Sequence, residues 1–341
     1  MNQITLTDSD RQFFYDNGYL VVSCAPLIQD QFLINQLKSQ FEKCFRGQFS
    51  TGIYPDEWHW RAGISNPGVV REICNAWKSD NVIRSVVLSP EIGSLGGQLY
   101  PHWTRVRVAQ DDVIWKVPQS TVKGHIGYHV DSAYISRQFE APETELKTKA
   151  IKELSERYNG HDFSTGSDSI TVWIALDDAD EENGVLEYVE RSHLLFGMRN
   201  TTKSFGVLSE SDEFAEAHKK IKDMLNFHTD AENPDEEKER FVAALNEVIN
   251  KNKNSLSMDS LMSIVKPQVP AGFCLIHHQN MLHGSGANIS MDRHRRALAV
   301  HLIDGDVKFV GAPTYIYGRY KLQGSVELRD EFFPVTWTRK E

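Results

Sequence analysis

Short β-strand patterns fill the chain from about Arg105 onward, and they restrict the possible folds more than any other feature of the sequence. These segments are rich in Val, Ile, Trp and Tyr, and turn residues separate them. They read RVRVAQ, VIWKV, GYHVD, ITVWIAL, GVLEYV, SIVKPQV, FCLIHH and RRALAVHLI. Because no regular helical crossovers separate them, the pattern favours a sandwich or barrel over a doubly wound parallel sheet.

The first hundred residues carry helical patterns instead. Apolar residues recur there at helical spacing, and Asn17-Gly18 is a typical helix stop. We expect helices at residues 7–16, 28–45, 69–77 and 80–87, and a short strand at 19–22. The N-terminal segment is therefore predicted to be a mainly helical layer over residues 1–100.

Two helical interruptions are expected inside the β region, which we place at residues 104–320. The first covers about residues 143–158, and the second covers about residues 211–251 and is strongly charged. The second is either an outer layer packed on the sheet or a lid over a site. At 341 residues the chain is long for one domain, but β folds with helical additions reach this length. We therefore expect a single domain over residues 1–341.

The charge and the cysteine content limit the partners and the compartment. The formal net charge is −10, which argues against a nucleic-acid partner. The four cysteines form no CxxC pair, so a reduced cytoplasmic setting is expected. The N-terminus lacks a signal-peptide pattern, and no apolar run approaches the roughly 20 residues that span a bilayer. We expect a small-molecule substrate and no membrane partner; the sequence leaves the oligomeric state open.

A histidine and a carboxylate stand two residues apart in one of the strand patterns. Side chains alternate along a strand, so His129 and Asp131 point the same way and can bind one metal ion. A second, distant histidine would complete a two-histidine, one-carboxylate face, which suits Fe(II) and leaves positions open for substrate and O2. His125 also lies nearby, across a glycine-bearing turn, so zinc is an alternative.

Three downstream histidines compete for the third ligand position. His277 and His278 adjoin, so they face opposite sides of a strand and cannot both be ligands. Only His283 precedes a Gly-Ser-Gly turn, which lets the backbone approach a ligand closely. We therefore favour His283 and expect structural roles for the other two. Arg295, twelve positions further on, could hold the carboxylate of an organic co-substrate in a bidentate pair.

Together these motifs resemble the phytanoyl-CoA dioxygenase family of Fe(II)- and 2-oxoglutarate-dependent oxygenases. The matching segments are VIWKVP…GYHVDSAYIS, ITVWIALDDADEENGVLEYVERSH and HGSGANISMDRHRRALAVHLI. The resemblance implies a mainly β (α+β) fold: a double-stranded β-helix core of the jelly-roll or cupin-like type, with N-terminal helices and helical insertions. The residues that it implies as iron ligands are His129, Asp131 and His283. Those that it implies for 2-oxoglutarate are Trp173, Ser285 and Arg295.

The sequence departs from the family pattern at two places that bear on this site. One extra residue separates His283 from Arg295, so Arg293 and Arg296 are possible substitutes for Arg295. Asp112 stands where relatives often have Met or Gln near 2-oxoglutarate. A buried carboxylate beside an anionic co-substrate would be costly. Asp112 is therefore expected to turn away, or to bind a cationic group of the substrate.

The resemblance implies that O2 and 2-oxoglutarate are consumed, that succinate and CO2 are released, and that an unactivated C–H bond is hydroxylated. Related halogenases have Ala or Gly in place of Asp131, so hydroxylation is favoured over halogenation, while desaturation and ring closure stay open. We expect a natural product or amino-acid-derived metabolite as substrate, in a pocket lined by residues 51–65, Tyr128 and Tyr134. The alternative is a cupin-like metal-binding isomerase or a non-catalytic small-molecule sensor.

Overall fold

A computed structural model describes residues 1–120, 124–135, 138–157, 169–196, 243, 246–247, 262–311 and 316–340. The insertion expected at about 211–251 lies outside these residues, apart from three of them. The helices are α1 (Asp8–Asn17), α2 (Gln31–Phe45), α3 (Asn81–Val87), α4 (Pro90–Leu99), α5 (Glu145–Arg157) and α6 (His193–Phe196), with 3-10 turns η1 (Ala76–Lys78), η3 (Asp131–Ala133) and η5 (Gly318–Tyr320). No helix of the described residues has both the length and the apolar character needed to cross a membrane.

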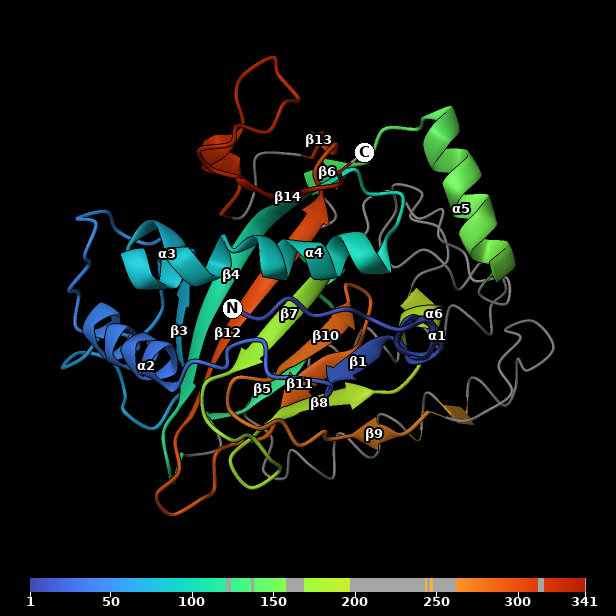
Figure 1. The fold of residues 1–341 in the computed structure, drawn as a ribbon. Coiled ribbons are helices and arrows are strands. Elements are labelled where there is room, and N and C mark those ends of the chain that lie inside the picture. The colour runs from blue at the N-terminus through green and yellow to red at the C-terminus, as the bar shows by residue number, and fades with distance from the viewer. Residues whose placement is uncertain are drawn as a thin grey trace.

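Most strands belong to two antiparallel sheets (Figure 1). The larger sheet has the order β1 (Tyr19–Val22), β10 (Cys274–His278), β7 (Ser169–Ala175), β12 (Arg295–Asp304), β4 (Arg105–Lys116), β3 (Arg71–Cys74) and β2 (Glu57–Trp58), and β14 (Val335–Thr338) also pairs with β4. The smaller sheet has the order β5 (Ile126–His129), β11 (His283–Ser285), β8 (Leu186–Val189) and β9 (Ile264–Val265). β6 (Phe139–Glu140) and β13 (Lys308–Phe309) form a separate pair. The fold is thus mixed α and β with mostly antiparallel sheets.

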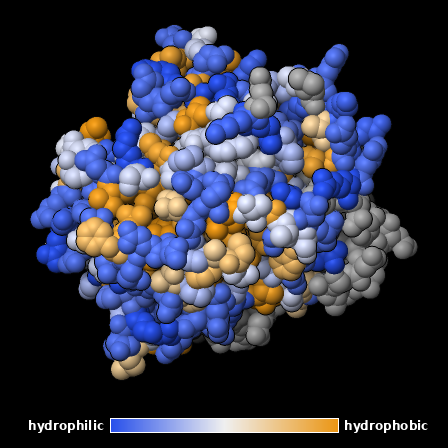
Figure 2. Space-filling model, in the orientation of Figure 1, coloured by the Kyte–Doolittle hydropathy of each residue, from blue (hydrophilic) through white to orange (hydrophobic). Residues whose placement is uncertain are grey.

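The two faces of the larger sheet have different partners, because successive side chains of a strand alternate between them. Helices α2, α3 and α4 lie across one face, where Val172 and Ile174 of β7 join a core with Leu37 and Phe41 of α2 (Figure 1). Trp173, between those two β7 residues, faces the other way and packs with side chains of the smaller sheet. The surface over the helices is mostly hydrophilic, with hydrophobic side chains in small groups (Figure 2). Inward-pointing residues of the larger sheet are therefore placed between the two sheets.

Three segments of the N-terminal hundred residues join the larger sheet, of which only β1 was expected, while helix α4 is present where no helix was expected. The helix expected at residues 69–77 is wrong: Arg71–Cys74 is strand β3, and a 3-10 turn follows it. β3 pairs with β4, which places Glu72 opposite Ile114 and Cys74 opposite Asp112. The hydrogen bonds offered by β4 outweigh the weak local helical pattern of this short segment. The helix expected at residues 143–158 is present as α5.

Candidate metal and co-substrate site

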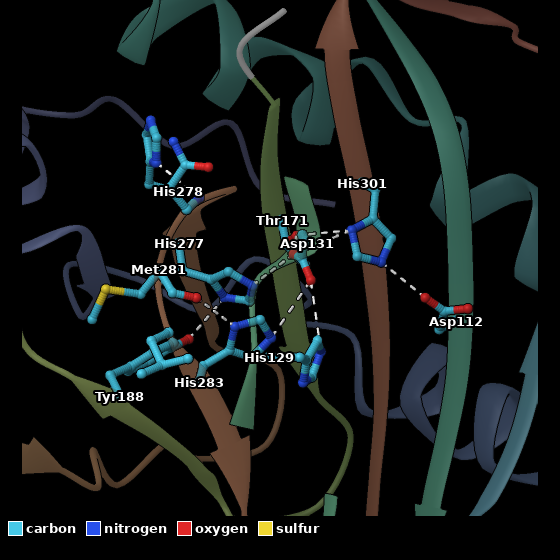
Figure 3. Close-up of polar contacts among 12 residues, drawn as sticks. Asp112, His129, Asp131, Thr171, Tyr188, His277, His278, Met281, His283 and His301 are labelled. Atoms are coloured by element: carbon cyan, nitrogen blue, oxygen red, sulfur yellow. Dashed lines mark hydrogen bonds and ion pairs between the residues drawn. The ribbon is translucent and has the colours of Figure 1, made fainter. Parts of the chain in front are cut away.

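Two histidines and one aspartate meet where β5 and β11 pair. His129 and His283 are directly opposite in that pairing, and their ring centroids are 4.3 Å apart. Asp131 begins the turn after β5, and its Oδ1 lies 3.8 Å from Nε2 of His129 and 3.6 Å from Nε2 of His283 (Figure 3). One donor atom from each residue lies within 4.8 Å of the others, as three ligands of one ion require.

Backbone carbonyls fix the tautomer of both histidines. Nδ1 of His129 donates to the Gly127 carbonyl at 2.9 Å, and Nδ1 of His283 donates to the Met281 carbonyl at 2.8 Å. Each Nε2 then carries an unshared electron pair toward Asp131, which is the form that binds a metal. Burial, the largest cause, and the neighbouring His129 lower the pKa of His283 well below its usual value, which keeps that ring neutral. The donor set fits Fe(II).

The two oxygens of Asp131 have different partners. Oδ1 faces the two histidines, whereas Oδ2 accepts hydrogen bonds from the Thr171 hydroxyl at 2.5 Å and from Nε2 of His277 at 3.1 Å (Figure 3). Burial alone would raise the pKa of Asp131, but the neighbouring His283, the hydrogen bond from His277 and the nearby His301 hold it well below its usual value. The carboxylate is therefore ionised and oriented, with one oxygen directed to the metal position.

His277 positions Asp131, which the sequence did not suggest. Its Nδ1 accepts a hydrogen bond from the Tyr188 hydroxyl at 3.0 Å, so its Nε2 carries the proton that Asp131 receives. His278 faces the opposite side, as the adjacency of the two histidines required, and its Nδ1 accepts from the Asn280 backbone N–H. The expectation of a purely structural role therefore fits His278 better than His277.

His301 on β12 extends this network away from the metal position. Its Nδ1 donates to the Thr171 hydroxyl at 2.8 Å, and its Nε2 donates to Asp112 at 2.8 Å. Despite burial, the hydrogen bonds to Asp112 and Asp131 raise the pKa of His301 to about 10, so it is an imidazolium. Asp112 does not turn away from the site. It lines the cavity that opens onto the histidine–aspartate cluster, and the positive charge of His301 balances its negative charge. The alternation of side chains along β7 indicates that Thr171 lies on the same face of the sheet as Trp173.

Arg295, at the start of β12, is fully buried and incompletely paired. Its Nε donates to the Gly184 carbonyl at 3.0 Å, and its Nη2 lies 3.5 Å from the Ser285 hydroxyl. Its guanidinium carbon lies 5.5 Å from the centre of the Trp173 ring. Nη1 has no hydrogen-bond partner among the residues that the structure describes, and burial lowers the pKa of this guanidinium to about 9. A buried cation with an unused donor is what an incoming carboxylate would satisfy.

Lys116 adds a second buried cation beside Arg295. The two residues are directly opposite in the pairing of β4 with β12. The Lys116 ammonium donates to the Ser285 hydroxyl at 2.6 Å and to the Gly286 carbonyl. Ser285, which was expected to bind 2-oxoglutarate, is therefore held by Lys116. The sequence did not single out Lys116, because only the strand order brings it to Ser285.

The other two arginines considered for this role lie elsewhere. Arg293 forms ion pairs with Asp180 and Glu182 near the surface. Arg296 points to the opposite face from Arg295 and is paired with Asp177. Neither arginine is directed at Trp173 or Ser285.

A cavity of about 570 Å³ opens onto the histidine–aspartate cluster. Tyr128 and Tyr134 line it, as expected, but His59 is the only residue of the aromatic segment 51–65 that does. Trp60 packs into the core against Phe45 instead. Trp173 and Ala299 also line the cavity. Ala299 and Ala297 lie between His301 and Arg295 on the inward face of β12, and of these four residues Ala299 and His301 line the cavity whereas Ala297 and Arg295 lie buried beyond it.

Comparison with known proteins identifies the family and the fold. The family model of phytanoyl-CoA dioxygenase (PhyH) matches residues 14–297. Comparison with curated proteins finds no match. Among solved structures, the epimerase SnoN from nogalamycin biosynthesis, in complex with Fe3+, alpha ketoglutarate and nogalamycin RO, is 15% identical with a TM-score of 0.56, covering 96% of this chain and 98% of its own.

Two further solved structures have the same fold. The non-heme alpha ketoglutarate dependent carbocyclase SnoK is 19% identical with a TM-score of 0.57, covering 97% of this chain and 96% of its own. EctD from S. alaskensis is 13% identical with a TM-score of 0.54, covering 96% of this chain and 86% of its own. At these identities the likeness concerns the fold alone.

Proposed function

Since the chain belongs to the phytanoyl-CoA dioxygenase family, we propose that it is an oxygenase that hydroxylates an unactivated C–H bond of a small molecule. Enzymes of this family use Fe(II), 2-oxoglutarate and O2. When bound, this set supplies the oxidising power, with release of succinate and CO2. The proposed substrate is a natural product or an amino-acid-derived metabolite, and the proposed location is the cytoplasm.

The arrangement of the sheets supports a double-stranded β-helix core. Two antiparallel sheets contribute to one apolar cluster, in which Trp173 of the larger sheet meets Tyr188 of the smaller. The candidate ligands come from the smaller sheet and the turn after β5, while Thr171, Arg295 and His301 come from the larger. A jelly-roll barrel of this kind places its binding site between its sheets.

In this proposal His129, Asp131 and His283 hold the iron. Thr171 and His277 keep Oδ2 of Asp131 occupied, so that Oδ1 alone is directed to the metal. A single-oxygen contact leaves coordination positions for 2-oxoglutarate and O2. Because Asp131 fills the position that halogenases leave open, hydroxylation is preferred over halogenation.

Arg295 and Ser285 would bind the distal carboxylate of 2-oxoglutarate, with Trp173 along its chain. The observation that carries the proposal is the Nη1 of the fully buried Arg295, which has no partner among the described residues and belongs to a guanidinium beside Trp173 of the cavity wall. A metal-binding isomerase or sensor that does not bind 2-oxoglutarate would leave this donor without a carboxylate partner. Burial of the histidine–aspartate cluster and of Arg295 between the sheets would also keep water away from the reacting groups.

The test is turnover under 18O2 with a panel of metabolites, measured by succinate release and by product mass. We expect a substrate-dependent rise in succinate and a product that carries one 18O atom. Asp131→Ala should abolish both signals, whereas Glu327→Gln, on the surface, should leave them unchanged. Succinate release without 18O in the product would contradict hydroxylation and favour desaturation or ring closure.

A further inference from the structure

Two carboxylates form one wall of the central cavity. Glu72 on β3 and Asp112 on β4 both line it, together with Ile114. Glu72 is directly opposite Ile114, and Cys74 is directly opposite Asp112, so these side chains share the inward face of the sheet. The wall lies on the far side of His301 from Asp131.

The charge of Asp112 is balanced, but that of Glu72 is not. Asp112 accepts hydrogen bonds from Nε2 of His301 at 2.8 Å and from the Gln110 amide at 2.8 Å. The Glu72 carboxylate has no hydrogen bond or ion pair with any residue that the structure describes. Burial, with the nearby charge of Asp112, raises the pKa of Glu72 to about 8. Glu72 is therefore largely protonated near neutral pH in the empty cavity, and it would ionise beside a bound cation.

The rest of the cavity lining offers no compensating cation. Its charged and titratable residues are carboxylates, histidines and tyrosines, and no lysine or arginine of the described residues lines it. Arg295 and Lys116, the buried cations nearby, are directed at Ser285. Because a partly buried carboxylate is costly without a partner, a ligand that brings positive charge would be favoured here.

We propose that the substrate carries a cationic nitrogen, a protonated amine or a guanidinium, which Glu72 and Asp112 bind. This inference rests on the proposed function, because it assigns the substrate of the same site. Only the imidazole of His301 and the Thr171 hydroxyl separate Asp112 from the metal ligand Asp131. A substrate anchored by its nitrogen at this wall would present a carbon a few bonds away to the metal.

A second metal ion is the competing occupant, since Glu72, Cys74 and Asp112 bring donor atoms within 4.8 Å of one another. The Cys74 thiol argues against it. Burial and the surrounding carboxylates raise its pKa well above the usual value, so it is a protonated thiol and a poor metal ligand. Two carboxylates of which one is already engaged by His301 make a weak site for a hard cation.

The experiment compares amines with their uncharged counterparts. Phenethylamine, cyclohexylmethylamine and agmatine, each paired with its N-acetyl derivative at the primary amine, are titrated into the protein loaded with Fe(II) and 2-oxoglutarate without O2. Ligand-observed NMR measures binding. We expect at least one of the two monoamines to bind roughly tenfold tighter than its N-acetyl form. A difference in affinity of this size corresponds to the loss of one hydrogen bond between charged groups. Glu72→Gln should remove that preference, while Glu327→Gln should keep it.

Equal binding of all pairs, or a preference that survives Glu72→Gln, would overturn the inference. Two tightly bound Mn²⁺ ions per chain, with one lost in Glu72→Gln, would also overturn it in favour of a metal site. The same titration without Fe(II) and 2-oxoglutarate separates this inference from the proposed function. An amine preference there, in a protein that a separate anaerobic titration shows not to bind 2-oxoglutarate, would keep the cationic ligand and contradict the oxygenase.

Discussion

Asp131 shows how one residue is prepared for metal binding by its neighbours. Its Oδ2 is occupied by Thr171 and His277, and its Oδ1 faces His129 and His283. Partners of this kind commonly change metal affinity by roughly 10–100-fold. Thr171→Val keeps the shape of the side chain but removes the hydroxyl, so we expect Fe(II) to bind about tenfold more weakly. Anaerobic Fe(II) titration measures this. Thr171→Ser should restore the affinity, and equal affinity in Thr171→Val would show that the hydroxyl has no positioning role.

Arg295 and Arg296 provide a matched pair for testing the co-substrate site. Arg295 is buried with a free donor, whereas Arg296 is paired with Asp177 on the other face of the strand. We expect Arg295→Gln to weaken 2-oxoglutarate binding by roughly 100-fold, since a buried charged contact is lost. Calorimetry on the Mn²⁺-loaded protein measures this, with Arg296→Gln as the control. Equal losses in both variants would point to a general structural defect instead.

Glu72 predicts a dependence of stability on pH. Burial raises its pKa in the folded protein to about 8, above the ordinary value of 4.5 for an unfolded chain. The unfolded chain therefore releases this proton first, and folding loses stability as pH rises from 4.5 to about 8. Glu72→Gln removes this loss, so its melting temperature should exceed that of the unmodified protein increasingly between pH 5 and pH 8.5. A difference that is constant with pH would contradict the burial of an unpaired carboxylate.

Strand β12 runs along one side of the proposed co-substrate site. Arg295 and His301 share its inward face, and Ala297 and Ala299 lie between them. Ala299→Leu would fill that space, so we expect 2-oxoglutarate affinity to fall more than about tenfold while Fe(II) still binds. Overpacking should also cost about 1–3 kcal/mol of stability. Titrations of the two ligands check this, and Ala299→Gly, which adds no volume, should bind both. Normal 2-oxoglutarate binding in Ala299→Leu would place the co-substrate elsewhere.

The difference between β12 and β3 shows what the sequence could predict about elements. The alternation in RRALAVHLI is long enough to identify a strand and to separate Arg295 from Arg296. β3 has four residues, too few for any period to be recognised, and its pairing with β4 decides its structure. The position of Glu72 in the cavity wall follows from that pairing. For this reason Glu72 could not be recognised as a cavity residue from its sequence context.

At the scale of the whole molecule, local motifs were predictable and long-range neighbours were not. His129 and Asp131 are two positions apart in the sequence, and the turn after His283 distinguished it from the other two candidate histidines. The contact of Asp112 with His301 joins residues 189 positions apart, and it depends on β12 lying beside β4. Strand order is a property of the complete sheet, so no single segment predicts it.

The central claim is that this chain binds Fe(II) and 2-oxoglutarate together between its two sheets. Anaerobic titration of the Fe(II)-loaded protein with 2-oxoglutarate tests it most directly. We expect a weak visible metal-to-ligand charge-transfer band that saturates at one 2-oxoglutarate per chain and requires Arg295. A protein that binds Fe(II) but gives no such band at saturating 2-oxoglutarate would contradict the account.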